Sequence, residues 1–221
     1  MFHSNGQMVS LSGFYKRFSG PIEIVQYATQ TGAFQPRNVG DGRVMGVEIE
    51  LRQSLDLISN LFRNFSIAAN GSVTKSKIEL STTEFISRSE NARTGQAIDN
   101  ARVMAGQAPY IINAGLNYNG GEKGFFDGLE AGIYYNVQGI TLQYIGIADL
   151  PDIYTLPFHS LNFNANKTLG KNKKTQMGIK MENLLNEKKE SVFRSFNVTD
   201  PFFTKLEPGI TFQIRLAYSL F

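Results

Sequence analysis

Two glutamates, Glu48 and Glu50, stand two positions apart in a run where apolar and polar residues alternate. On an extended strand, such side chains share one face at a spacing of about 7 Å. Paired carboxylates at about that distance can act as a general acid and a general base. Arg52 continues the same face, so the three residues also have the composition of an ordinary polar wall. We predict the wall, and we predict that the protein is not an enzyme.

Few other side chains in the sequence are of the types that carry out catalysis or bind metals. The chain has no cysteine and two histidines, His3 and His159, so neither a metal site nor a Ser–His–Asp arrangement is expected. A basic turn spans residues 171–174, and we interpret it as solvated. The net charge is only +3, and no basic stripe suggests a nucleic-acid partner. We therefore expect no cofactor, no metal and no nucleic acid.

The clearest pattern that could position such groups is at the end of the chain, in residues 209–221. Apolar residues fall on every second position there, and polar or small residues fall between them. A period of two indicates a strand with one apolar and one polar face. The apolar positions are Ile210, Phe212, Ile214, Leu216, Tyr218 and Leu220.

Seven earlier stretches show the same alternation. We predict strands over residues 7–17, 43–54, 63–79, 110–118, 127–146, 154–168 and 175–184. Within 127–146 the apolar phase changes after Gly139, which predicts a β-bulge. Residues 80–107 and 187–206 lack a pattern, and we expect both to form long loops.

The eight predicted strands are joined by connections that are alternately long and short. This arrangement is typical of an up-and-down antiparallel sheet in an outer membrane. No apolar run reaches 18 residues, so no transmembrane helix is expected. The predicted strand at 127–146 is far longer than the ~9–11 residues that cross a bilayer, which favours a barrel that extends beyond the membrane.

The polar faces distinguish membrane-facing from lumen-facing positions. In the central parts of the strands, charges gather on one face and are missing from the other. A Lys or Arg directed into lipid at the bilayer midplane costs about 2–4 kcal/mol, so we predict that the charged face lines a lumen. Tyr110, Tyr118, Tyr144 and Tyr218 fit interfacial girdles. The predicted lumen-facing residues are Glu48, Glu50, Arg52, Glu130, Lys180, Glu182 and Arg215.

Four stretches, in this order and spacing, resemble the carboxy-terminal part of a TonB-dependent outer-membrane receptor of the Bacteroidetes type. The resemblance covers almost the whole chain. The stretches are Gly46-Val47-Glu48-Ile49-Glu50-Leu51, Gly106-Gln107-Ala108-Pro109-Tyr110-Ile111-Ile112-Asn113, Asn183-Leu184-Leu185-Asn186 and Phe212-Gln213-Ile214-Arg215-Leu216-Ala217-Tyr218-Ser219-Leu220-Phe221.

This resemblance implies that residues 1–221 form the carboxy-terminal portion of a transmembrane β-barrel of about 22 strands. It implies import of a scarce nutrient such as an iron chelate, haem, cobalamin, a glycan or a peptide. The implied partners are outer-membrane lipid and lipopolysaccharide, the remaining strands, the plug domain, the TonB system and the barrel-assembly machinery. We expect no plug domain within the chain, because the resemblance is to about the last eight strands of the family's barrel. We expect no signal peptide, because residues 1–7 lack a basic and apolar leader.

The two long predicted loops are the candidates for ligand contact, because binding residues concentrate on loops above a rigid scaffold. Packing of these loops without a ligand is the alternative. The ligand-contact candidates are Arg93, Arg102, Phe193, Arg194, Phe196, Phe202 and Phe203.

Two other interpretations of the whole chain stay open at this point. The first is a self-contained eight-stranded outer-membrane barrel with a structural or adhesive role, its lumen filled by side chains. The second is a soluble β-sandwich that acts as a binding module, in which the apolar face would be a shared core.

Overall fold

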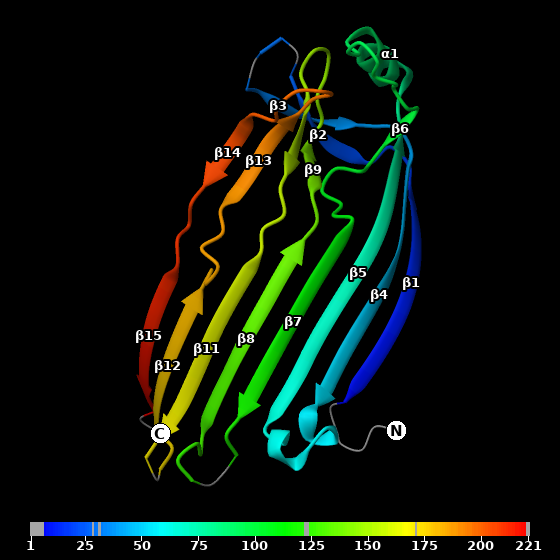
Figure 1. Cartoon of the computed structure of the whole chain (residues 1–221). Coiled ribbons are helices and arrows are strands. Elements are labelled where there is room, and N and C mark those ends of the chain that lie inside the picture. Colours follow the sequence, from blue (N-terminus) through cyan, green and yellow to red (C-terminus); the bar gives the residue numbers. More distant parts are fainter. Residues whose placement is uncertain (1–6, 28, 31, 122–123, 171, 220–221) are drawn as a thin grey trace.

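The computed structural model describes residues 7–27, 29–30, 32–121, 124–170 and 172–219. Eight long strands form one antiparallel sheet, as predicted (Figure 1). The predicted end of the last strand at Phe221 lies outside the described residues. In sheet order the strands are β1 (Met8–Phe18), β4 (Gly42–Ser54), β5 (Phe65–Glu79), β7 (Tyr110–Asn119), β8 (Leu129–Gln138), β11 (Ser160–Leu169), β12 (Thr175–Glu182) and β15 (Thr211–Tyr218).

Neighbouring strands along the chain are neighbours in this sheet, which is the up-and-down topology predicted above. The two outer strands, β1 and β15, lie at opposite edges of the curved sheet (Figure 1). Cross-strand pairs continue over many strands, as in the row Leu51–Ala69–Ala114–Tyr135. Because side chains alternate between faces, each such row places all its members on one face of the sheet.

A second group of short elements lies at one end of the long sheet, and we call it the cap (Figure 1). One part is a four-stranded sheet in the order β14-β13-β10-β9, and another is the hairpin β2–β3. The bounds are β2 (Ile22–Gln26), β3 (Phe34–Asn38), α1 (Thr82–Glu90), β9 (Thr141–Tyr144), β10 (Asp152–Thr155), β13 (Lys189–Arg194) and β14 (Phe202–Leu206). The short strand β6 (Ala101–Arg102) lies beside the cap but pairs with the end of β5, and is the ninth strand of the long sheet.

The bulge predicted at Gly139 is wrong, because the chain leaves the long sheet there and starts a strand of the cap. β8 ends at Gln138 and β9 begins at Thr141 in the other sheet. The backbone passes very close to its neighbours at this point: a Cβ on Gly139 would lie 2.8 Å from Cγ of Pro109. The predicted strand at 154–168 divides in the same way, into β10 and β11.

The two predicted long loops also contain regular structure. Residues 80–107 include α1, whose first turn is capped by Ser81: its side chain accepts a hydrogen bond from Glu84 N at 3.1 Å. Residues 187–206 form the hairpin β13–β14. Short 3₁₀ turns, η1 (Leu55–Leu57) and η2 (Asn60–Phe62), join β4 to β5. Among the described residues, no helix has the length and apolarity to cross a membrane.

The hydrophobic core of this chain is located in the cap. Val25, Leu142 and Ile145 are buried against one another, and Tyr154 packs against them. Tyr144, predicted for an interfacial girdle, instead packs its ring against Phe34 at 4.5 Å. The long sheet places most of its apolar side chains on an open face, so hydrophobic burial stabilises mainly the cap, whereas hydrogen-bonded pairing holds the sheet together.

We call the apolar part of that open face the apolar belt. It begins at the row that contains Phe65 and Tyr118 and ends at the row that contains Val73 and Tyr110. On β5 the belt covers the nine residues Phe65–Val73, close to the ~9–11 that span a bilayer. Val73 is 69% exposed and Leu11, two rows away, is 73% exposed. A soluble monomer rarely exposes so large an apolar surface.

Candidate functional site

The face opposite the apolar belt is polar, and the registers place all seven predicted lumen residues on it. One row runs through Arg215, Gly178, Asn166 and Glu130. Arg52 pairs with Glu50 at 2.8 Å, and Lys180 pairs with Glu182 at 2.9 Å. The charges of this wall are therefore partly neutralised within single strands.

A ladder of asparagines crosses the centre of the same face. Asn70, Asn113 and Asn136 are directly opposite one another on β5, β7 and β8. Asn113 Nδ2 donates to Asn70 Oδ1 at 2.7 Å, and Asn136 Nδ2 donates to Asn113 Oδ1. Glu50 extends the row onto β4. Amide ladders of this kind fix the register between strands, so the wall has a defined surface of donors and acceptors.

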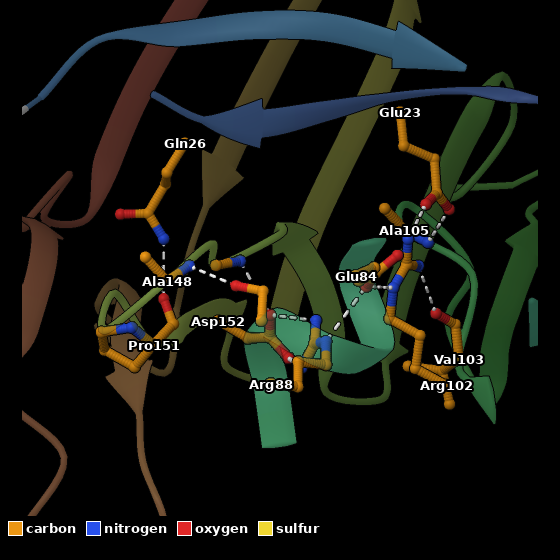
Figure 2. A network of polar contacts seen from close by, with 12 residues as sticks. Glu23, Gln26, Glu84, Arg88, Arg102, Val103, Ala105, Ala148, Pro151 and Asp152 are labelled. Atoms are coloured by element: carbon orange, nitrogen blue, oxygen red, sulfur yellow. Dashed lines mark hydrogen bonds and ion pairs between the residues drawn. The ribbon is translucent and has the colours of Figure 1, made fainter. Parts of the chain in front are cut away.

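Above this wall, a chain of ion pairs ties the cap together (Figure 2). Arg88 holds Asp152 through two hydrogen bonds, at 2.9 and 3.1 Å, and reaches Glu84 at 3.0 Å. Arg102 Nε donates to the same Glu84 oxygen at 2.7 Å. The other end of Arg102 lies 2.7 Å from Glu23. Five charged side chains from β2, α1, β6 and β10 thus form one network.

The network also binds backbone groups. Glu23 accepts a hydrogen bond from Ala105 N at 2.7 Å, and Asp152 accepts one from Gly146 N at 2.8 Å. Burial acts to lower the pKa of Arg102, but its contacts with Glu84 and Glu23 outweigh that effect and the pKa is raised. Both arginines therefore stay charged, and their positions are fixed by carboxylates on two sides.

A cavity of about 260 Å³ opens beside this network and collects three of the predicted ligand-contact residues. Arg93, Arg194 and Phe196 line it, together with Gly146 and residues 148–151 of the turn between β9 and β10. Arg88 and Asp152 of the ion network also border it. We call it the loop pocket. Neither guanidinium is ion-paired with a carboxylate anywhere in the described ranges. Arg194 lies over the ring of Tyr154 at 5.6 Å, which holds its side chain at the rim.

The other four predicted contact residues occupy different surroundings. Arg102 is 8% exposed and belongs to the ion network. Phe193 and Phe203 pack on each other at 5.3 Å between ring centres, and Phe203 also contacts Tyr144. Phe202 is exposed, with Lys205 over its ring. The loop pocket therefore unites Arg93, Arg194 and Phe196, whereas these four support the cap or face outward elsewhere.

Sequence reasoning missed the network residues Glu23, Glu84, Arg88 and Asp152. One signal was available: Ser81 followed three positions later by Glu84 is the signature of a capping box, which would have located α1. No comparable signal links Glu23 to Arg102 or Asp152, because they are far apart in the sequence. In the ranges that the structure describes, no group of three His, Cys, Asp or Glu side chains is placed to hold a metal ion.

Comparison with known proteins agrees with this architecture. The family model described as "TonB dependent receptor-like, beta-barrel" matches residues 2–184. A search of curated proteins found no match. The copper transporter OprC is similar in fold, with a TM-score of 0.62 at 17% sequence identity.

The likeness to OprC covers 98% of this chain and 30% of the transporter. This chain therefore spans about a third of the length of that protein, and at this identity the likeness concerns the fold alone. The sheet of eight long strands corresponds to a section of a larger barrel wall. The match over residues 2–184 extends through most of that sheet, and the chain belongs to the TonB-dependent receptors.

Proposed function

We propose that this chain forms part of the outer-membrane barrel through which a TonB-dependent receptor imports one scarce nutrient. The apolar belt is the observation that carries the proposal. Its nine-residue height on β5 matches the thickness of a bilayer. Many of its side chains, such as Ile49, Ile112 and Ile214, are exposed on a face that is free of charge at its centre. The polar face behind it would then line the lumen.

Both ends of the belt have the aromatic residues that favour a membrane interface. At the turn end, Phe65 packs against Tyr118, with 4.9 Å between ring centres, and Phe126 also packs against Tyr118, edge to face. Lys167 lies on the same face just beyond them and directs its ammonium to the carbonyl oxygens of Phe125 and Asp127. A lysine at this level can reach water, as snorkelling requires.

The edges of the sheet argue against a self-contained eight-stranded barrel. Such a barrel needs β1 to pair with β15, but within the described part of the chain each of these strands pairs with one neighbour only. A soluble sandwich needs a second sheet over the belt, and the small cap sheets lie at its end instead (Figure 1). The proposal therefore includes further barrel strands, a plug domain, the TonB system and the barrel-assembly machinery as partners.

The loop pocket is the proposed point of contact with the nutrient. Two arginines without carboxylate partners favour an anionic group, and Phe196 offers an apolar surface beside them. Asp149 also lines the pocket, so a group with both charges would fit as well. The ion network fixes α1 and β10 on two sides, which presents the pocket in a preformed shape.

The test is growth of a deletion strain that carries the complete receptor, with one nutrient limiting at a time. The panel contains ferric chelates, haem, cobalamin, copper, glycans and peptides. We expect the parent protein to be required for one class. The pair Arg93→Gln and Arg194→Gln should weaken binding of an anionic member by at least about tenfold, because charged hydrogen bonds contribute roughly 1.5–3 kcal/mol each.

Arg63→Gln is the matched control, because Arg63 lies in the short connection between η2 and β5 at the opposite end of the sheet. If the double variant grows as the control does on every nutrient, the loop pocket is not the contact site. If the protein is missing from the outer-membrane fraction, the import proposal itself is refuted.

A further inference from the structure

An aromatic ring lies flat on the lumen face, in the middle of the long sheet. Tyr134 of β8 is directly opposite Gly115 of β7 and shares its face with Gly132, two residues earlier. A Cβ on Gly115 would lie 2.8 Å from Cδ1 of Tyr134, and a Cβ on Gly132 would lie 2.7 Å from Cε2. The ring therefore covers the backbone of two buried glycines, with one of its faces against the sheet.

The position of this ring is fixed at its far end. The Tyr134 hydroxyl donates a hydrogen bond to Oδ1 of Asn117 at 2.6 Å. Tyr134 is nevertheless 37% exposed, and the ring face that does not cover the glycines is directed to the lumen. Covering glycines is a known structural role for an aromatic residue in a sheet, but that role does not explain the side chains around the ring.

Those side chains are neutral and rich in amides. Among the described residues on the lumen face of β7, β8 and β11, only Glu130 near the turn end is charged. These three strands are neighbours in the middle of the sheet (Figure 1). We use the name amide surface for Tyr134 together with Asn113, Asn117, Asn136, Asn162 and Asn164.

Some of these amides are used within the protein and others are open. Asn162 donates to the Ser160 hydroxyl at 2.9 Å and accepts from Asn183 N at 3.0 Å. In the described part of the chain, the Asn164 side chain and Oδ1 of Asn136 have no protein partner. An amide offers donors and acceptors together, which is also what a hydroxyl group requires.

The lumen face is hollowed beside the amide surface. A depression of about 370 Å³ begins at Asn113 and extends over β5 and β4 to β1. Glu48 and Glu50 also line it: Glu50 is paired with Arg52, and Glu48 lies 3.5 Å from the Ser12 hydroxyl. Carboxylate oxygens are acceptors for hydroxyl groups, so the depression continues a surface that suits hydroxyl-rich molecules.

We propose that the amide surface binds the sugar rings of an oligosaccharide. The face of an aromatic ring is partially negative, and the C–H bonds on one face of a sugar ring are partially positive, so a sugar would lie flat on Tyr134. Its hydroxyl groups would bond to Asn136 and Asn164. The inference rests on the proposed import function, for which it supplies the chemical class of the nutrient; the loop pocket would hold an anionic group of the same molecule.

The test is isothermal titration calorimetry of the complete receptor in lauryldimethylamine oxide, a detergent without sugar groups. The probes are neutral hexasaccharides of glucose, xylose and mannose, which examine the amide surface without involving the arginines of the loop pocket. We expect at least one probe to bind with a dissociation constant of about 1 mM or lower. Tyr134→Leu keeps the glycines covered but removes the flat ring, and it should weaken binding about tenfold.

Two further variants separate ligand binding from folding. Tyr134→Phe keeps the ring and loses only the hydrogen bond to Asn117, so it should bind like the parent. Asn164→Ala removes a side chain without a protein partner in the described ranges; it should leave the unfolding midpoint unchanged and weaken binding by about threefold to tenfold. This variant tests the inference even if Tyr134→Leu does not fold.

The matched control is Tyr218→Leu, because Tyr218 is a 63% exposed tyrosine on the belt face. It should keep the parent affinity. The inference is overturned if none of the hexasaccharides binds to the folded receptor, if Tyr134→Leu and Asn164→Ala both bind like the parent, or if the control loses as much affinity as Tyr134→Leu.

Other readouts show which proposal has failed. If no sugar binds and Tyr134→Leu raises the ion conductance of the receptor in planar bilayers, the amide surface contacts the plug domain and the sugar proposal is refuted. Import of a nutrient without sugar rings would likewise overturn this inference and leave the import function intact. Absence of the receptor from the outer-membrane fraction would instead refute the import function.

Discussion

Ala69 lies at the centre of the apolar belt and is the position where a charge tests the membrane-facing side most directly. It is four residues from each end of the stretch Phe65–Val73, or about 13 Å at 3.3 Å per residue. An arginine at this site is too short to bring its guanidinium to either interface. Ala69→Arg should therefore cost about 2–4 kcal/mol, the range for a basic residue facing lipid at the midplane.

The next residue provides the control, because a shift of one position moves a side chain to the other face. Asn70 is directly opposite Glu50, so Asn70→Arg gains a carboxylate neighbour while it loses the hydrogen bond from Asn113. We expect it to change the stability by less than about 1 kcal/mol. Ala69→Met controls for side-chain size and should be nearly neutral.

The assay is the folding equilibrium of the complete receptor in phosphatidylcholine vesicles, titrated with urea and followed by heat-modifiable migration in gels. Ala69→Arg should lower the equilibrium constant by roughly 30-fold to several hundred-fold, since 1.4 kcal/mol is a factor of ten. Equal losses for Ala69→Arg and Asn70→Arg would refute the assignment of the two faces. A neutral Ala69→Arg would show that the belt does not meet lipid.

Three further outcomes follow from the cap and the sheet. Asp152→Asn leaves Arg88 without its bidentate partner, so amide hydrogen exchange in α1 should accelerate by about 30-fold or more, equivalent to roughly 2–3 kcal/mol. Burial raises the pKa of Tyr154 above its ordinary 10.0, so the fold favours the neutral phenol. The stability of the cap should therefore be retained below pH 10 and lost as the pH rises above it. Tyrosinate absorbance follows this titration. Gly46→Ala should destabilise the protein by about 1–3 kcal/mol in urea unfolding, because the new Cβ would lie 2.7 Å from a backbone oxygen. Gly71→Ala should not destabilise it, because the nearest atom to the new Cβ would be 3.5 Å away.

The long sheet could be predicted because each of its strands meets two different environments. Alternation along β4, β12 and β15 is strict, and period two identifies both the strand and its faces without knowledge of the neighbours. The charged wall, including Glu48 and Glu130, was found in the same way. These features depend on local sequence alone.

The cap could not be predicted in the same way, because its contacts join distant parts of the chain. Glu23, Arg102 and Asp152 belong to one network but lie in three separate segments, each of which is simply polar. The sequence pattern at Gly139 predicted a bulge, because the alternation of apolar residues changes phase there. The same change of phase arises when one strand ends and a strand of another sheet begins. The division is visible only from the strand pairing in the structure, where β8 and β9 belong to different sheets.

On β5 the face of the apolar belt changes from apolar at Val73 to charged at Lys75, and on the other face Val44 of β4 and Ile78 of β5 are buried at the cap end. This reversal of polarity has a consequence for the order in which the protein folds. Below the reversal, the apolar side chains need lipid; above it, Val44 and Ile78 need the interior of the cap. In the proposed membrane placement, with the cap on the outer side, the five charges of the ion network cross the bilayer before they pair, and their native geometry requires the strands beneath them to be aligned. We expect insertion of the strands to come first and closure of the cap last, so the outer surface of the receptor would mature only after its wall is in place.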